Sequence, residues 1–150
     1  MDHVAYMKKE WGLLPKILSG EKKIESRWYK TKHLPWDKIN VGDRIFFKNS
    51  GEPVTVVSKV GKVIKFESLT PKRIRKILEK YGQDDGITKD KLNYFYKLFV
   101  DKKYCLLIFL TGAEKIEPFE IDKRGFGQMA AWITVEDIDI IKREPAGAGR

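Results

Sequence analysis

Apolar and polar residues alternate along this chain with periods that predict many short strands. Residues 23–29 come close to the period of two that is typical of a half-buried strand, with Ile24, Ser26 and Trp28 on one face. Turn residues such as Gly61 separate the apolar runs from one another. The predicted strands cover residues 3–7, 23–29, 44–48, 53–60, 63–66, 103–110, 114–121, 130–133 and 138–141.

Three stretches predict helices instead. Residues 9–19 predict a helix that is broken or kinked near Gly12 and Pro15, since proline lacks the amide of a mid-helix bond. Residues 71–81 place apolar side chains at helical spacing and begin with a threonine cap followed by proline. Residues 89–99 predict a second short helix, so two helices interrupt the series of strands.

Composition predicts one domain. The chain has 150 residues, of which 42% are hydrophobic and 34% charged, a mixture that is ordinary for a globular protein. Many short strands with a central helical pair indicate an α+β fold: a single small β-barrel of five to seven strands with an N-terminal helix. We expect this domain over residues 1–145, with the helical insertion at about residues 71–99 and a flexible tail at 146–150.

Neither a membrane span nor a disulfide is predicted. The longest apolar run, residues 105–110, is far shorter than the ~20 residues that cross a bilayer, and no basic and apolar leader opens the chain. Cys105, the one cysteine, lies inside that run, where we expect a small buried side chain. We therefore expect a soluble, cytoplasmic protein that is not secreted.

The distribution of charge along the chain indicates which class of partner the protein binds. The net charge is +9, and all of the excess lies in residues 1–75, which hold 17 basic and 8 acidic side chains. Residues 76–150 hold 13 of each. Such asymmetry favours a surface that faces a polyanion such as RNA.

The sequence offers little for several classes of enzyme. His3, His33 and Cys105 are isolated, so they form no metal-ligand spacing and no Ser-His-Asp or Cys-His arrangement is indicated. Gly125 and Gly127 lack the strand-to-helix context of a phosphate-binding loop. We therefore expect no metal and no nucleotide cofactor.

One cluster of charged residues remains at the start of the second strand, in the segment GEKKIESRW. If the strand begins near residue 23, Glu25 and Arg27 point the same way and Lys22 leans over them. Such a triplet is either a structural ion-pair network or the floor of a pocket with donors and an acceptor. Spacing alone favours the structural interpretation.

The same segment resembles the GxKxxExR signature of the ASCH domain, a branch of the PUA-like superfamily of small β-barrels associated with RNA metabolism. Gly20, Lys22, Glu25 and Arg27 match all four fixed positions. The context is similar as well, because the signature follows a helix and enters a strand. The resemblance extends over about residues 3–142 and is strongest before residue 60.

The resemblance implies an RNA-binding module that holds single-stranded or modified RNA in a cleft lined by Lys22, Glu25 and Arg27. The alternative that it implies is an enzyme, either a ribonuclease or an amidohydrolase acting on acetylated cytidine, with Lys22 and Glu25 as catalytic residues. Relatives with the second activity use a threonine where this chain has Glu25. A third possibility is a domain that contacts protein partners in translation or transcription.

Two further segments are candidates for the same cleft. Lys48, Asn49 and Ser50 place a cation, an amide and a hydroxyl at a turn, which suits a phosphate or a base edge and is equally typical of an ordinary turn. Arg124 and Phe126 belong to a basic, glycine-rich segment whose composition suits stacking on an unpaired base. The alternative for Phe126 is that its ring caps the barrel.

Overall fold

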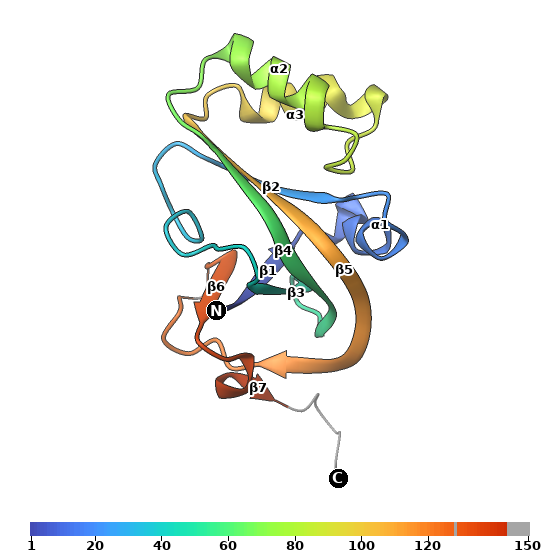
Figure 1. The fold of residues 1–150 in the computed structure, drawn as a ribbon, viewed down its shortest axis with the longest axis vertical. Helices are drawn as coiled ribbons and strands as arrows, with labels where there is room; N and C mark the ends of the chain where they lie inside the picture. The colour runs from blue at the N-terminus through green and yellow to red at the C-terminus, as the bar shows by residue number, and fades with distance from the viewer. Residues whose placement is uncertain (128, 144–150) are drawn as a thin grey trace.

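A single mixed sheet forms the body of the molecule, with neighbouring strands in the order β2-β5-β4-β3-β1-β6 (Figure 1). The computed structural model describes residues 1–127 and 129–143. Strands β1 and β3 are parallel, and the other pairs are antiparallel. The strands are β1 (Asp2–Met7), β2 (Ile24–Tyr29), β3 (Arg44–Asn49), β4 (Val54–Phe66), β5 (Tyr104–Ile121), β6 (Trp132–Val135) and β7 (Lys142–Arg143), which pairs with the end of β5.

Strands β4 and β5 are longer than the sequence predicts. The stretches predicted at 53–60 and 63–66 form one strand from Val54 to Phe66, because the chain passes through a bulge at Gly61 without turning. A Cβ atom on Gly61 would lie 2.7 Å from the Thr111 methyl group, so only glycine allows this approach. Residues 103–110 and 114–121 likewise merge into β5, which bends strongly and has Gly112 at a φ of 60°.

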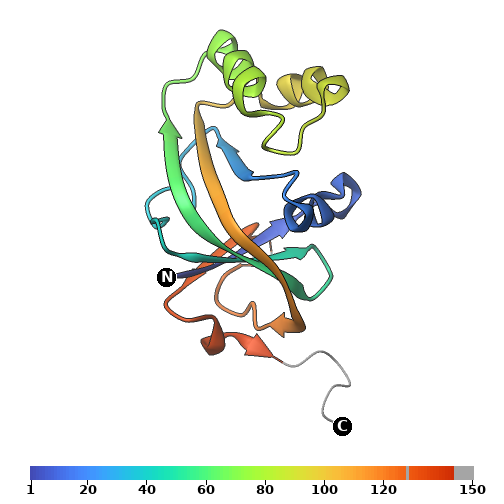
Figure 2. The ribbon, with the colours of Figure 1, turned by 45° about the vertical axis from the view of Figure 1, so that its right-hand side comes forward.

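The sheet curves into a half-barrel around an apolar core, and the predicted α+β fold is confirmed (Figure 2). Its edge strands β2 and β6 do not pair with each other. The Arg27 side chain on β2 reaches across instead and donates to the carbonyl oxygens of Tyr6 on β1 and Ala131 before β6. The core contains side chains from most of the strands and from the first helix, including Ala5, Ile17, Ile45, Phe47, Val56, Leu106 and Ile108.

Helices cover the ends of this half-barrel. The predicted break at Gly12 is confirmed: a short 3-10 turn, η1 (Lys9–Trp11), precedes it, and α1 (Leu13–Ser19) follows. Pro15 lies in the first turn of α1, where a missing amide proton leaves no bond unmade. Leu14 and Ile17 turn inward from α1 to the core.

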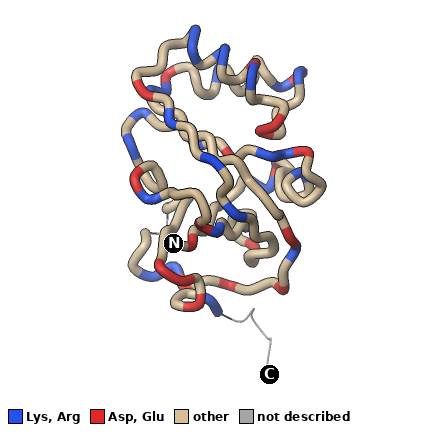
Figure 3. The backbone as a smooth tube through the Cα atoms, in the orientation of Figure 1, with Lys and Arg blue, Asp and Glu red and all other residues tan. Residues whose placement is uncertain are grey.

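The helical insertion between β4 and β5 is confirmed. It consists of α2 (Pro71–Tyr81), a 3-10 turn η2 (Lys89–Lys91) and α3 (Leu92–Phe99). Thr70 caps α2 by accepting a hydrogen bond from the Arg73 amide. Both helices pack on an apolar cluster with side chains of β2 and β5, while Lys and Arg recur along α2 (Figure 3).

The end of the described chain differs from the prediction, since the strand expected at residues 130–133 is β6 at Trp132–Val135 and β7 was not expected. Residues 138–141 do not form a strand; they contain the 3-10 turn η3 (Ile138–Ile140). Two carboxylates fix this turn, because Asp137 accepts from the Asp139 amide and Asp2 accepts from the Ile138 amide. Ile138 and Ile141 are buried, whereas Ile140 is 70% exposed, so burial here follows the 3-10 turn and not the alternation of a strand.

Candidate functional site

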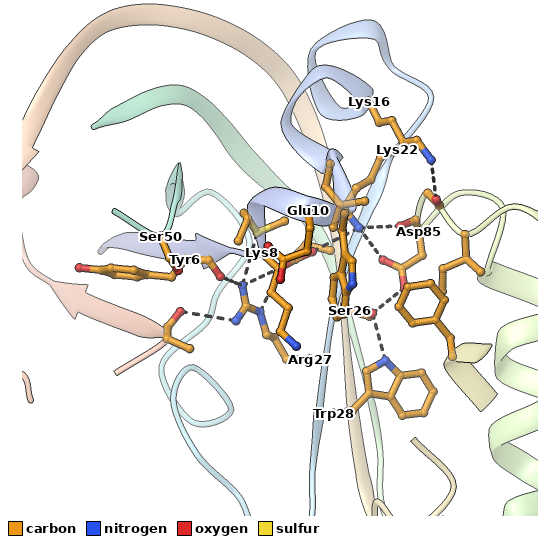
Figure 4. Close-up of a pocket in the computed structure, with 18 of the residues that line it drawn as sticks. Tyr6, Lys8, Glu10, Lys16, Lys22, Ser26, Arg27, Trp28, Ser50 and Asp85 are labelled. Carbon is orange, nitrogen blue, oxygen red and sulfur yellow. Dashed lines mark hydrogen bonds and ion pairs between the residues drawn. The ribbon is translucent and has the colours of Figure 1, made fainter. Parts of the chain in front are cut away.

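A pocket of about 960 Å³ opens between the half-barrel and the helical insertion (Figure 4). Its walls come from β1, the segment around η1 and α1, strand β2, the loop before η2, helix α3 and residues 129–131. All three residues of the charged triplet line this pocket: Lys22, Glu25 and Arg27. The fold thus brings the GxKxxExR segment to the wall of a cavity large enough for a nucleotide.

Local backbone geometry turns Lys22 inward. Gly20 ends α1 at a φ of 83°, and the Lys22 amide then donates to the Lys16 carbonyl oxygen, which reverses the chain toward β2. Lys22 is 2% exposed, and its ammonium nitrogen lies 2.6 Å from the Ile24 carbonyl oxygen. The same nitrogen lies 3.2 Å from Glu25 Oε1. A buried ammonium group is therefore tied to the strand that it precedes.

Glu25 joins this ammonium group to the guanidinium of Arg27. Glu25 is 4% exposed, and its Oε2 accepts from Arg27 Nε at 3.0 Å and from Arg27 NH2 at 2.8 Å. Arg27 also stacks over the Trp132 ring, 5.0 Å from its centroid. Arg27 also connects the two edges of the half-barrel through its bonds to the Tyr6 and Ala131 carbonyl oxygens. The Glu25–Arg27 ion pair is therefore part of the structure of the half-barrel.

Asp85 completes the network, and the sequence analysis missed it. This residue lies in the loop between α2 and η2, and its Oδ1 is 2.6 Å from the Lys22 ammonium nitrogen. Its backbone carbonyl accepts from the same nitrogen at 2.7 Å, and its Oδ2 accepts from the Ser26 hydroxyl. The Trp28 indole N–H donates to that hydroxyl at 3.0 Å.

Backbone bonds hold the Asp85 loop against β2. The Asp84 carbonyl oxygen accepts from the amides of Lys23 and Ile24, and the Lys16 ammonium group donates to the Gly86 carbonyl oxygen. Asp84 and Asp85 differ sharply, because the first is exposed and the second is 7% exposed. The insertion is thus fastened to the charged segment at the floor of the pocket.

The charges of this floor alternate along a chain from Asp85 through Lys22 and Glu25 to Arg27. Burial opposes the charge of Lys22, but the carboxylates of Asp85 and Glu25 outweigh it and raise the pKa of this ammonium group. Burial also opposes the charge of Glu25, yet the two cations beside it lower its pKa. Burial dominates at Asp85 and, helped by the charge of Glu25, raises its pKa.

Aromatic side chains form another part of the pocket wall. Trp28 stacks on Phe99 with centroids 4.6 Å apart and planes at 7°, and Phe99 stacks on Phe95 at 5.8 Å. Trp11 meets Phe95 edge-on at 5.2 Å. Tyr94 extends the row and is 53% exposed. Trp11 and Trp28 are therefore rim aromatics of the pocket.

The segment at the end of β3 reaches a different side of the same pocket. Ser50 is exposed and lines it, whereas Lys48 and Asn49 lie beside it on β3. Lys48 is 7% exposed, with its ammonium nitrogen 4.8 Å from the ring centroid of Tyr6. Asn49 donates from Nδ2 to Glu52.

Arg124 and Phe126 do not reach the pocket lining in the described part of the chain. Arg124 makes paired hydrogen bonds to the carboxylate of Asp122, which lower the pKa of that carboxyl to about 2. Phe126 is half-buried and packs on the apolar cluster of Val4 and Phe46, so its ring is not the exposed aromatic expected from the sequence. Their part in RNA binding stays a prediction.

Within residues 1–127 and 129–143, no group of three or more His, Cys, Asp or Glu side chains is placed to hold a metal ion. His3 instead contacts Asp43, Thr134 and the Trp132 indole inside the protein. The helices described also include none with the length and apolar character of a membrane span. The predicted tail, residues 146–150, lies outside the described residues.

Comparison with solved structures identifies the fold. The ASCH protein of Zymomonas mobilis superimposes with a TM-score of 0.64 at 14% identity, over 96% of this chain and 98% of that one. A tyrosine-to-phenylalanine variant of the same protein gives 0.66 at 14% identity, over 93% of both chains. The N-terminal domain of Staphylothermus marinus McrB gives 0.57 at 16% identity, over 93% of this chain and 90% of that domain.

No family model matches the sequence, and no curated protein sequence matches it. At identities of 14–16% the structural likeness establishes the fold and nothing finer. The chain has the fold of an ASCH domain, and the predicted resemblance is confirmed at that level.

Proposed function

We propose that this chain, which has the ASCH-domain fold, binds single-stranded or modified RNA and holds one base in the pocket beside Lys22, Glu25 and Arg27. The observation that carries the proposal is the composition of the pocket: an aromatic wall, a polar floor and a basic rim around one cavity of about 960 Å³. Unpaired bases are recognised by this combination of stacking, edge hydrogen bonds and phosphate contacts.

The aromatic wall supports binding of a base over binding of a bare polyanion. Tyr94 and Trp11 line the pocket from different elements, α3 and η1, so they flank the cavity at its rim. Stacking on an aromatic side chain contributes about 1–3 kcal/mol per base. A wall of this kind is poorly suited to double-stranded RNA, whose bases are stacked on one another.

The basic rim supports a phosphate backbone along the mouth of the pocket. Lys8, Lys91 and Lys123 line it, and Lys8 and Lys91 are exposed. The net charge of +9 adds a long-range attraction for RNA that weakens as salt is added.

The geometry of the floor favours binding over catalysis. The Lys22 ammonium nitrogen has four oxygen atoms within 3.2 Å, and both oxygens of Glu25 contact cations. A general base needs access to the proton that it removes, and an ion-paired, buried carboxylate with a lowered pKa is a weak one. These contacts support a floor that stays in place while a base is held against it.

The test is the affinity for fluorescent single-stranded oligoribonucleotides, measured by anisotropy for the wild type and for Tyr94→Ser. We expect single-stranded RNA to bind more tightly than a duplex of the same sequence. The variant should lose about 5-fold or more, because it removes one stacking surface. Ile140→Ser is the matched control, since Ile140 is 70% exposed on η3 and does not line the pocket. Equal affinity for single strands and duplexes, or no effect of Tyr94→Ser, would contradict the proposal.

A further inference from the structure

The two lysines that flank the Tyr6 ring, Lys48 and Lys123, carry a further inference that rests on the proposed function. We propose that they form a phosphate subsite, which binds the phosphodiester group of the RNA next to the base held in the pocket. The floor then positions the base, and this end of the pocket positions the backbone.

Lys48 is a buried cation without a carboxylate partner. It is 7% exposed, and among the described residues its ammonium group has no hydrogen bond and no ion pair; its nitrogen lies 4.8 Å from the centroid of the Tyr6 ring. Buried ammonium groups are ordinarily paired with an anion. An anionic ligand would supply the partner that the protein does not.

Lys123 places a second ammonium group beside the same ring. Its nitrogen lies 4.4 Å from the Tyr6 ring centroid, so both cations lie within 5 Å of one point. They come from distant parts of the chain, the end of β3 and the loop after β5. The charge of Lys123 acts unfavourably on that of Lys48, and an anion bound at this ring would be attracted by both cations.

Among the described residues, no carboxylate lies within ion-pair distance of Lys48. Glu120 attracts Lys48 from beyond ion-pair distance, and the charge of Lys123 opposes that attraction. Burial is the largest influence and lowers the pKa of Lys48. Tyr6 Oη, on the ring that both lysines contact, is also buried without a hydrogen-bond partner among the described residues. The Lys48 ammonium group and this hydroxyl are thus left unsatisfied by the described part of the protein.

The position of the pair fits a phosphate that is covalently joined to a bound base. Tyr6, Ser50 and Lys123 all line the pocket, and Arg27 of the floor donates to the Tyr6 carbonyl oxygen. One residue of β1 therefore touches both the floor and the lysine pair. A nucleotide with its base over Arg27 has its phosphate within reach of that pair.

The test is a methylphosphonate scan of an oligoribonucleotide that binds the wild type. Each analogue replaces one phosphodiester by an uncharged group, and all oligonucleotides carry a 5′-hydroxyl so that no terminal phosphate competes. We expect one position at which the wild type loses about tenfold in affinity or more, the size of a charge-assisted hydrogen bond. Lys48→Met should lose less than about twofold there, because its partner is already gone.

Three controls keep the test decisive. Lys123→Met replaces Lys48→Met if the latter does not fold. The methylphosphonate that weakens binding to the wild type should have a smaller effect on Lys123→Met as well. Lys115→Met, on an exposed part of β5, should leave the wild-type scan unchanged. Melting temperature checks that each variant is folded.

The outcomes separate the two proposals. If the wild type binds RNA and every analogue weakens the wild type and the Lys48 variant equally, the subsite is wrong and the proposed function stands. If the wild type binds none of the oligonucleotides, both are wrong. If the loss at one position in the wild type disappears in the Lys48 or Lys123 variant and persists in Lys115→Met, the subsite is supported.

Discussion

The floor of the pocket and its Lys48 end hold their charges in opposite ways. On the floor, Lys22 and Glu25 are each in contact with two oppositely charged groups. At the other end, Lys48 is buried to a similar degree, with the Tyr6 ring beside it and Glu120 beyond ion-pair distance. Burial of a charge therefore does not by itself mark a binding site. The satisfied network on the floor stabilises the fold, whereas we propose that Lys48 receives an anionic ligand.

The difference arises from how the chain assembles each region. Three segments meet at the floor: the turn after α1, strand β2 and the Asp85 loop of the insertion. The Lys48 end is built from β1, β3 and the loop after β5. At the floor, Lys22 contacts one carboxylate from β2, that of Glu25, and one from the insertion, that of Asp85. Among the described residues, Lys48 forms no such ion pair.

The largest expected change in the free energy of unfolding comes from a substitution in the floor of the pocket. Lys22→Met should lower the free energy of unfolding by about 3–5 kcal/mol, because it leaves the carboxylates of Asp85 and Glu25 buried without their shared cation. Urea denaturation measures this loss. Lys23→Met is the matched control, since the neighbouring side chain is exposed. A loss no larger than that of the control would show that the floor is not a stabilising network.

A smaller loss of stability is expected at Asp85, where the helical insertion contacts Lys22. Asp85→Asn should lower the free energy of unfolding by about 1–3 kcal/mol, because the amide keeps the shape but weakens the bond to Lys22. Asp84→Asn should change little, since that side chain is exposed and only its backbone carbonyl contacts β2. Equal denaturation curves for the two variants would contradict this account of the floor.

The smallest expected change in the free energy of unfolding is at Lys48, and it is a gain and not a loss. Lys48→Met should leave the protein as stable as the wild type or more stable by about 0–1 kcal/mol at neutral pH, because it removes an unpaired buried charge and keeps the apolar stem.

The pH dependence checks the cause of that gain. The folded-state pKa of Lys48 lies below its ordinary value of 10.5, so the unfolded chain binds its proton more tightly. The wild type therefore gains stability as pH rises through the lowered pKa, and the advantage of Lys48→Met should shrink toward pH 10.5. Denaturation at neutral and alkaline pH measures this, and a destabilised variant at neutral pH would contradict it.

Much of this fold could be predicted because local patterns coincide with it. The alternation in residues 23–29, the cap and spacing of 71–81 and the glycine at position 12 each dictate the structure at their own place in the chain. The long strands β4 and β5 were divided in the prediction, since Gly61 looks like a turn residue. Only its contact with Thr111 on the neighbouring strand reveals a bulge.

The candidate site was predicted in part for the same reason. Lys22, Glu25 and Arg27 are close in sequence, so strand geometry places them together. Asp85 lies 63 positions from Lys22, and nothing near it distinguishes it from Asp84. The one feature of the sequence that could have indicated Asp85 is that Asp84 and Asp85 form an acidic pair in a polar loop between two predicted helices. Such a pair could have been expected to contact the first half of the chain, which is unusually basic.

One NMR titration tests the central claim most directly. The lysine side-chain signals are recorded at neutral pH while a single-stranded oligoribonucleotide that binds the protein is added. The account predicts that the signals of Lys48 and Lys123 shift on binding and that those of Lys22, enclosed by its carboxylates, stay where they were. Shifts at Lys22 with none at Lys48 would contradict the account, because the floor would then hold the backbone and the Lys48 end would be structural.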